Sequence, residues 1–135
     1  MALTPITSKR EIYSDFHKDF LLNPVSSDLA RKINEEAVKD SIRNLLLTDR
    51  GERLFQPQLG SDIRQLLFEN NTADTIVILR EAVRDTIISH EPRCNLISVD
   101  VQSAIDANAV TVKIVFNVIN SQTPIDLTVT LTRVR

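Results

Sequence analysis

The stretch SHEPRCNLISVDV, residues 89–101, contains the change of pattern that decides the fold. Hydrophobic residues before it recur at the spacing of a helix, and those after it alternate as in a β-strand. Between the two patterns lies the tripeptide Glu91-Pro92-Arg93. Proline has a fixed φ and pushes the residue before it out of the helical region. The stretch therefore predicts that a helix ends before Pro92 and that a strand follows this rigid, charged joint.

Three helices are predicted upstream of the joint. The first begins at Asn34, a good N-cap residue, and ends near Arg50-Gly51, where glycine can adopt the left-handed conformation. The second is short, over residues 62–69 with Ser61 as its cap, and the third begins after Thr72. Their expected inward residues are Val38, Ile42, Leu45 and Leu46 in the first helix, Ile63, Leu66 and Leu67 in the second, and Ile76, Leu79, Val83 and Ile87 in the third.

Three strands are predicted downstream of the joint, because apolar and polar residues alternate there in three segments separated by turn residues. The residues expected on the apolar face are Ile97, Val99 and Val101, then Val110, Val112, Ile114, Phe116 and Val118, and finally Ile125, Leu127, Val129 and Leu131. Short connections favour an antiparallel meander with one buried face. Helices followed by strands predict an α+β fold, a two-layer domain with the helices packed on one face of a three-stranded antiparallel C-terminal sheet.

The chain of 135 residues is long enough for one hydrophobic core. Residues 1–27 show little periodicity, so we expect an N-terminal arm there and a single α+β domain over residues 28–135. Cys94 is the only cysteine, which excludes an internal disulfide and is typical of a reducing compartment. No signal-peptide pattern and no run of about 18 apolar residues occurs, so neither a leader nor a membrane segment is expected.

Composition and spacing point away from several kinds of chemistry. The net charge of −2 gives no bulk attraction to nucleic acid or to an anionic membrane, so neither is expected as a partner. His17, His90 and Cys94 lack the spacing of a metal site, and two glycines cannot form a phosphate loop, so we expect no metal and no cofactor. Pro92 interrupts the helical geometry that would bring His90, as a base, toward Cys94.

A catalytic pair of acids is not predicted either. With 18 acidic residues, some pair at a glycosidase separation is expected by chance, so the number itself carries no information. Sugar clefts usually carry aromatic stacking surfaces, whereas this chain has no Trp and one Tyr. We therefore predict no catalytic residue and no enzyme activity.

Two motifs in a fixed order carry a resemblance to a known family. The first is TDRGERLFQPQLGSDIRQLLFE, residues 48–69, and the second is HEPR, residues 90–93. The matching positions are Thr48, Gly51, Arg53, Pro57, Gly60, Phe68 and the tripeptide Glu91-Pro92-Arg93. With this set the chain resembles the baseplate wedge family of contractile tails, which includes phage sheath-initiator proteins and the matching baseplate component of type VI secretion. The similarity extends from about Ile12 to the C-terminus.

The resemblance implies a structural protein of the virion, a baseplate wedge component of a contractile phage tail that is assembled in the host cytoplasm. The Glu91-Pro92-Arg93 joint is expected to bind a helical bundle of larger baseplate wedge proteins. The C-terminal strands are expected to template the first ring of tail sheath protein by β-strand augmentation. Some relatives carry a lysozyme label, so a baseplate-associated lysozyme that hydrolyses peptidoglycan is one alternative. A type VI secretion baseplate component and an adaptor domain unrelated to tails are the others.

The expected protein-interface residues lie at the joint, in the loop after the first helix and on the last strand. They are Glu91, Pro92, Arg93, Arg50, Arg53, Thr128, Thr130 and Thr132. Each group has a second interpretation that the sequence leaves open: an internal salt bridge or helix-end cap at the joint, a solvated loop, and a solvated edge strand. The residues alone favour the internal interpretation at the joint, although the planar guanidinium of Arg93 suits bidentate pairing across an interface. The family resemblance then favours the interface.

Overall fold

The computed structural model describes residues 10–69, 72–104, 109–121 and 123–132. Residues 1–37 and residues 38–135 form two compact units. This division into two units does not test which residues act as an arm. The predicted arm over residues 1–27 and domain over residues 28–135 therefore stay a prediction.

A short antiparallel pair of strands organises the described part of the first unit. β1 (Ser14–Phe16) pairs with β2 (Arg31–Ile33). Asn34 follows β2 with a φ of +47°, and its side-chain oxygen accepts hydrogen bonds from the backbone N–H groups of Ile12 at 2.9 Å and Tyr13 at 3.2 Å. Asn34 therefore holds the segment before β1 in place instead of capping the helix that begins there, and its predicted N-cap role is wrong.

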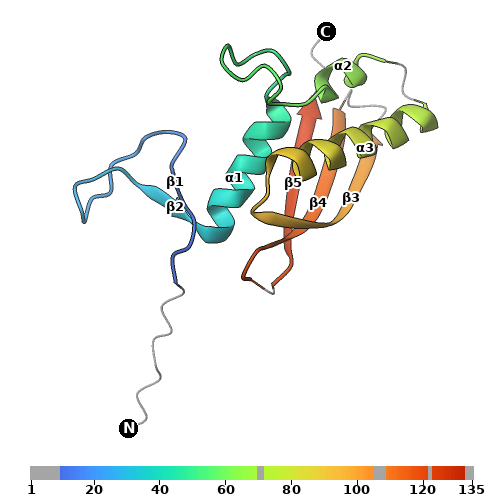
Figure 1. The fold of residues 1–135 in the computed structure, drawn as a ribbon. Helices are drawn as coiled ribbons and strands as arrows, with labels where there is room; N and C mark the ends of the chain where they lie inside the picture. The colour runs from blue at the N-terminus through green and yellow to red at the C-terminus, as the bar shows by residue number, and fades with distance from the viewer. Residues whose placement is uncertain (1–9, 70–71, 105–108, 122, 133–135) are drawn as a thin grey trace. The chain divides into compact units, whose positions relative to one another are not determined.

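The described part of the second unit contains a helical layer and a sheet. The helices are α1 (Asn34–Leu47), which begins in the first unit, α2 (Ile63–Leu67) and α3 (Ala73–His90), and the strands are β3 (Cys94–Ala104), β4 (Ala109–Val118) and β5 (Ile125–Thr132). In Figure 1 the helices lie on one face of the sheet, whose strand order is β3-β4-β5 with antiparallel pairing. The predicted α+β fold with a three-stranded C-terminal sheet is confirmed.

The core between the helices and the sheet is almost entirely aliphatic. Residues of β5 alternate strictly between buried and exposed, because successive side chains of a strand point to opposite faces. The buried residues of β4 and β5 are Val112, Ile114, Phe116, Val118, Ile125, Leu127, Val129 and Leu131. The helices contribute Val38, Ile42, Leu45, Leu46, Ile63, Leu79, Val83 and Ile87, as predicted. Leu66, Leu67 and Ile76 were also predicted inward, but they are only half-buried.

The register of β3 differs from the predicted alternation at Ile97. Leu96 pairs with Phe116 and Ser98 pairs with Val115, so Ile97 is an extra residue in a β-bulge. The bulge leaves Ile97 55% exposed, whereas Leu96 shares a face with buried Phe116. The prediction that Ile97 faces the core is therefore wrong, because simple alternation assumes a regular strand.

The connection between α1 and α2 also differs from the prediction. α1 ends at Leu47, earlier than expected, and the Thr48 hydroxyl donates to the Asn44 carbonyl at 2.7 Å. The buried Ser61 hydroxyl does not cap α2, because it donates to the Leu46 carbonyl at 2.8 Å. Ser61 thus ties the segment before α2 to the end of α1, a contact between residues that are distant in sequence.

The boundaries of α3 are the predicted ones. Thr72 caps the helix, since its hydroxyl accepts a hydrogen bond from the backbone N–H of Thr75 at 3.3 Å. The helix ends at His90, because the proline at position 92 forbids a further turn. The change from helix to strand within residues 89–101 is confirmed.

Candidate protein-interaction surfaces

The joint between α3 and β3 contains a buried carboxylate and its arginine partner. Glu91 is 4% exposed, and the Arg93 guanidinium donates from Nε to Oε1 at 2.7 Å and from Nη2 to Oε2 at 2.9 Å. The hydroxyl of Ser41, on α1, also donates to Oε2 of Glu91. Two of the predicted interface residues, Glu91 and Arg93, therefore form an internal ion pair. The hydrogen bond from Ser41 to the same carboxylate ties α1 to the end of α3.

The outer part of the joint remains at the surface. Pro92 is exposed, and 26% of the Arg93 side chain is accessible. A protein that bound here would meet Pro92 and the accessible part of the Arg93 side chain, whereas Glu91 holds the guanidinium in place. The interface role of the joint stays a prediction.

Two opposing effects set the ionisation of Glu91. Burial raises the pKa of Glu91, whereas hydrogen bonds from Arg93 and Ser41 and the positive charge of Arg93 lower it, and the resulting pKa lies below the ordinary value. The carboxylate is therefore charged at neutral pH. A buried charge is tolerated only when it is paired and hydrogen-bonded, so the stability of the joint depends on both partners.

Cys94, the first residue of β3, is not an activated nucleophile. Burial and the charge of Glu91 raise the pKa of the Cys94 thiol to about 11, although Arg93 partly opposes the shift. The thiol is protonated at neutral pH, and it donates to the Glu91 carbonyl at 3.4 Å. Within the described residues, no group of three or more His, Cys, Asp or Glu side chains could hold a metal ion. None of the helices described is long and apolar enough to cross a membrane.

The α1–α2 loop (residues 48–62) is held in a fixed shape at its base. The backbone N–H of Gly51 donates to the Pro57 carbonyl at 2.9 Å, and that of Ser61 donates to the Thr48 carbonyl at 2.9 Å. Gly60 has a φ of +123°, and a Cβ there would lie 2.6 Å from the Thr48 carbonyl oxygen. The close approach of two backbone segments thus requires glycine at position 60.

The two arginines predicted at an interface lie on this loop. Nη1 of Arg50 pairs with Oδ2 of Asp62 at 3.2 Å, close to the surface. Arg53 is exposed further along the loop. Surface ion pairs contribute little to stability, so Arg50 and Arg53 are not needed to hold the loop and remain candidates for a contact.

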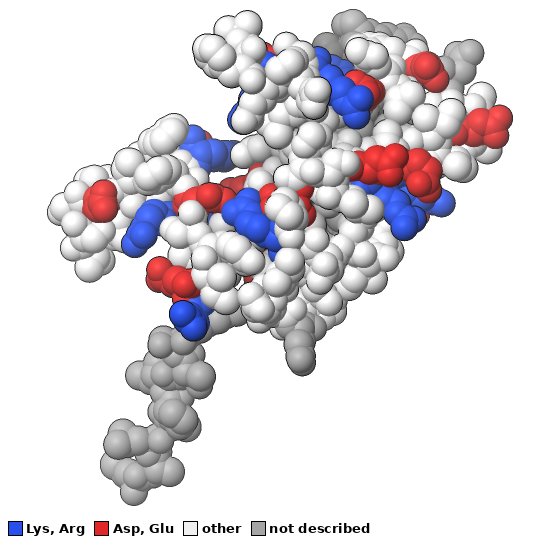
Figure 2. All heavy atoms as spheres, viewed as in Figure 1, with Lys and Arg blue, Asp and Glu red and all other residues white. Residues whose placement is uncertain are grey.

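The α1–α2 loop also exposes two large apolar side chains that sequence analysis missed. Leu54 is 90% exposed and Phe55 is 97% exposed. Figure 2 shows the loop, at the upper left of this view, as a projection with mainly uncharged side chains. The available signal is a pair of large hydrophobic residues between two glycines, but the sequence cannot tell whether such a pair reaches the core.

The α1–α2 loop and the joint lie side by side in the folded unit. An open hollow is lined by residues 55–59 of the loop and by His90, the residue before Glu91. The structure therefore brings this loop close to the end of α3, although the predicted interface residues Arg50 and Arg53 do not themselves line the hollow.

β5 forms the more open edge of the sheet. Among the described strands it pairs with β4 only, and the side chains of Thr128, Thr130 and Thr132 are exposed. The opposite edge strand, β3, is interrupted by the bulge at Ile97, a feature that discourages pairing with another strand. The three threonines thus lie on an edge strand of the described sheet, and their interface role stays a prediction.

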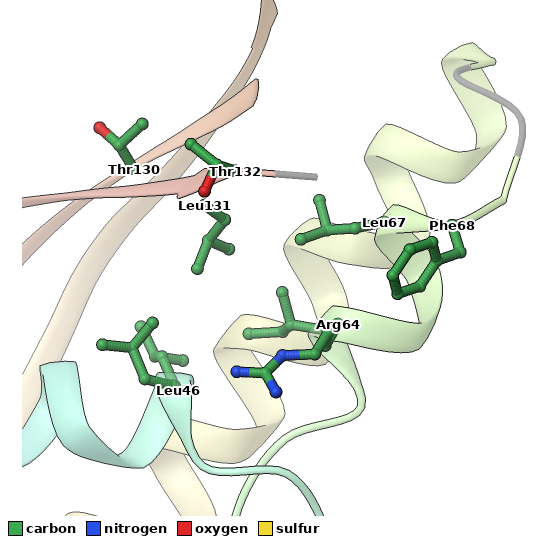
Figure 3. Close-up of a pocket in the computed structure, with 9 residues that line it drawn as sticks. Leu46, Arg64, Leu67, Phe68, Thr130, Leu131 and Thr132 are labelled. Carbon is green, nitrogen blue, oxygen red and sulfur yellow. The ribbon is translucent and has the colours of Figure 1, made fainter. Parts of the chain in front are cut away.

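A groove lies beside the C-terminal end of β5. Thr130, Leu131 and Thr132 line one side and the ends of α1 and α2 line the other, around a volume of about 360 Å³. Figure 3 shows Leu131 and Leu67 reaching toward the same space, with the Arg64 guanidinium beside them. Sequence analysis missed this groove because its walls come from three separate elements.

The joint and the groove lie at opposite ends of the sheet. Phe116 in β4 pairs both with Leu96, close to the joint, and with Ile125, the first residue of β5. Thr132 is the last residue of β5, about 23 Å from Ile125 at a strand rise of about 3.3 Å per residue. The structure therefore places Thr130 and Thr132, which line the groove, toward the end of the sheet away from the joint.

Comparison with known sequences identifies the family. Residues 33–123 match the family described as baseplate wedge protein gp25. The chain is 28% identical over 116 residues to baseplate wedge protein gp25 of Enterobacteria phage T4, and the alignment covers 86% of this chain and 87% of the phage protein.

Solved structures share the fold. The crystal structure of a putative tail lysozyme from Geobacter sulfurreducens has a TM-score of 0.69 and 28% identity, covering 75% of this chain and 92% of that chain. A chain of the anti-feeding prophage baseplate, solved by cryo-EM, has a TM-score of 0.63 and 20% identity, covering 87% and 83%. The family match spans more than half of the sequence, and the chain therefore belongs to the baseplate wedge protein gp25 family.

Proposed function

We propose that this chain binds larger baseplate wedge proteins through the Glu91-Pro92-Arg93 joint and starts the first ring of tail sheath protein at the open edge of β5. Its family makes the chain a baseplate component of a contractile tail. The two partners, the residues that contact them and assembly in the host cytoplasm are parts of the proposal.

One observation carries the proposal: two different surfaces lie at opposite ends of one sheet. The joint, with Pro92 and part of Arg93 at the surface, lies at one end, and the groove beside the open edge of β5 lies at the other. A packed sheet fixes the distance and orientation between the two surfaces. A wedge protein bound at the joint would therefore hold β5 in a set direction, as a template for a ring requires.

The edge of β5 suits pairing with an extended segment of sheath protein. An edge strand presents backbone N–H and C=O groups, and an added strand pairs with them through main-chain hydrogen bonds. Thr128, Thr130 and Thr132 are strong strand formers and tolerate either water or a neighbouring strand. Alternate side chains of the added segment would reach the apolar groove around Leu131 and Leu67.

Substitutions at Thr130 test the sheath contact. Thr130→Pro removes a backbone donor from β5, and Thr130→Lys keeps the donor but adds the kind of charge that guards natural edges. Both variants are expected to bind wedge proteins normally, because the joint is distant from Thr130. Both are expected to block sheath polymerisation, because they disturb strand pairing at the edge of β5. Electron microscopy of assembled tails is the measurement.

The matched control is Gln102→Lys, which places the same charge on exposed β3 at the other edge and is expected to leave sheath assembly intact. Circular dichroism must show that all three variants are folded. Sheathed tails of normal length on folded Thr130→Lys would exclude β5 as the template.

We also propose that the chain is not an enzyme. The groove beside β5 and the hollow beside the α1–α2 loop have no carboxylate among their lining residues. A third hollow, between α3 and β3, has one, that of Glu81. Glycoside hydrolysis needs two carboxyl groups flanking the bond. The purified protein is expected to leave the turbidity of a peptidoglycan suspension at the buffer level. Clearing that disappears when Glu81 or another acid is replaced by its amide would establish the lysozyme alternative.

A further inference from the structure

We infer that Leu54 and Phe55 form an apolar anchor, which inserts into a hydrophobic pocket of the wedge protein that binds the Glu91-Pro92-Arg93 joint. This inference rests on the proposed wedge contact and adds its hydrophobic part. The joint offers the partner mainly a proline ring and about a quarter of the Arg93 side chain, since Glu91 is buried. Interfaces usually derive most of their affinity from a few large side chains that become fully buried.

The exposure of the anchor is unusual because two adjacent large side chains are almost fully exposed, whereas the adjacent Phe20, Leu21 and Leu22 are 53–67% exposed. Single exposed hydrophobic residues are normal on protein surfaces and need no explanation. Leu54 and Phe55, however, are each at least 90% exposed and lie together on the projecting loop. Neither side chain contributes to the core, so their presence is not explained by folding.

The loop holds the anchor in a preorganised conformation. Backbone hydrogen bonds on both sides of it join Gly51 to Pro57 at 2.9 Å, and the N–H of Gln56 to the Arg53 carbonyl at 3.3 Å. The Glu52 carboxylate accepts from the backbone N–H of Asp49 at 3.0 Å. A side chain presented on a fixed loop loses less conformational entropy on binding than one on a disordered loop.

The position of the anchor indicates that its partner is the protein that binds the joint. Phe55 lines the same hollow as His90, which precedes Glu91 directly, so one partner surface can cover both features. Arg53, exposed beside the anchor, favours a carboxylate at the rim of the partner's pocket. Two apolar residues beside the single basic residue Arg53, which itself follows the acidic Glu52, are too few for stable membrane attachment, which needs a larger apolar area or a basic patch.

The test is the affinity of the full chain for the purified larger wedge proteins of the same tail, measured by titration calorimetry. The double variant Leu54→Ser/Phe55→Ser is expected to bind roughly a hundredfold more weakly. The matched control, Gln65→Ser/Gln102→Ser, changes two exposed polar residues outside the loop and the joint and is expected to bind like the original chain. A second variant, Leu54→Met/Phe55→Leu, keeps the apolar character and is expected to retain most of the affinity.

Both serine variants are expected to have the thermal midpoint of the original chain, because the changed side chains are exposed. Equal binding by the original chain and the Leu54→Ser/Phe55→Ser variant would overturn the anchor while leaving the wedge contact in place. No binding by the original chain would overturn the wedge contact, and the anchor with it. Co-sedimentation with anionic phospholipid vesicles that is lost in the double variant would assign the anchor to a membrane and overturn the inference.

Discussion

Replacement of Arg93 by methionine is expected to lower the free energy of unfolding at neutral pH by about 3 kcal/mol. Methionine fills part of the same space but cannot donate, so the Glu91 carboxylate loses hydrogen bonds of 2.7 Å and 2.9 Å. Removing one partner of a buried ion pair leaves an uncompensated charge. We place the effect at the lower end of the usual range because Arg93 is partly accessible and Ser41 still donates to the carboxylate.

The effect of Arg93→Met is expected to depend on pH with a definite sign. In the original chain the pKa of Glu91 lies below its ordinary value of 4.5, so its contribution to stability is complete above pH 4.5 and is lost as the pH falls through the lowered pKa. In the variant, burial raises the pKa of Glu91 without opposition from arginine, so protonation relieves the unpaired charge. The difference in unfolding free energy is therefore expected to shrink as the pH is lowered toward about 4.

Urea unfolding at a series of pH values is the measurement. The matched control is Arg43→Met, which removes a surface pair between Arg43 and Asp40 at 3.5 Å. This control is expected to cost less than about 1 kcal/mol. A loss of stability in Arg93→Met that stays constant down to low pH would mean that the ion pair with Glu91 is not its cause.

Replacement of Gly60 by alanine is expected to lower the free energy of unfolding by about 3 kcal/mol or more. The added Cβ would lie 2.6 Å from the Thr48 carbonyl oxygen and 2.9 Å from the Asp49 carbonyl carbon, and these backbone atoms cannot move aside freely. The same carbonyl of Thr48 accepts the Ser61 N–H at 2.9 Å, so relief of the clash would break this hydrogen bond. The φ of +123° adds backbone strain for any residue with a Cβ.

Gly51 provides the control for this prediction within the same loop. It has a φ of +82°, but a Cβ there would meet nothing within 4 Å. Gly51→Ala therefore carries only the conformational penalty, about 1–2 kcal/mol. Thermal and urea unfolding of the two variants measure the difference. Equal losses in both would show that backbone conformation alone, and not the close approach at Gly60, is what requires glycine.

The sequence by itself determined the order and type of the elements in the second unit. Pro92 ends α3 because a proline excludes the helical conformation of the residue before it. The alternation in β5 predicts its buried residues correctly, because a regular strand has a period of two. These features depend on local backbone preferences and on hydrophobic periodicity, which residues close together in the sequence carry. The family resemblance depends on the same short motifs and is confirmed.

Only the tertiary structure decided which side chains pair, which are buried and which remain exposed. Ser61 donates to the end of α1 instead of capping α2, and Ile97 leaves the core face because a bulge shifts the register of β3. The Glu91 carboxylate is buried where it meets Ser41 of α1, whereas Leu54 and Phe55 stay exposed because the loop carries them away from the core. Each outcome depends on contacts between segments far apart in the chain, and local sequence preferences do not contain that information.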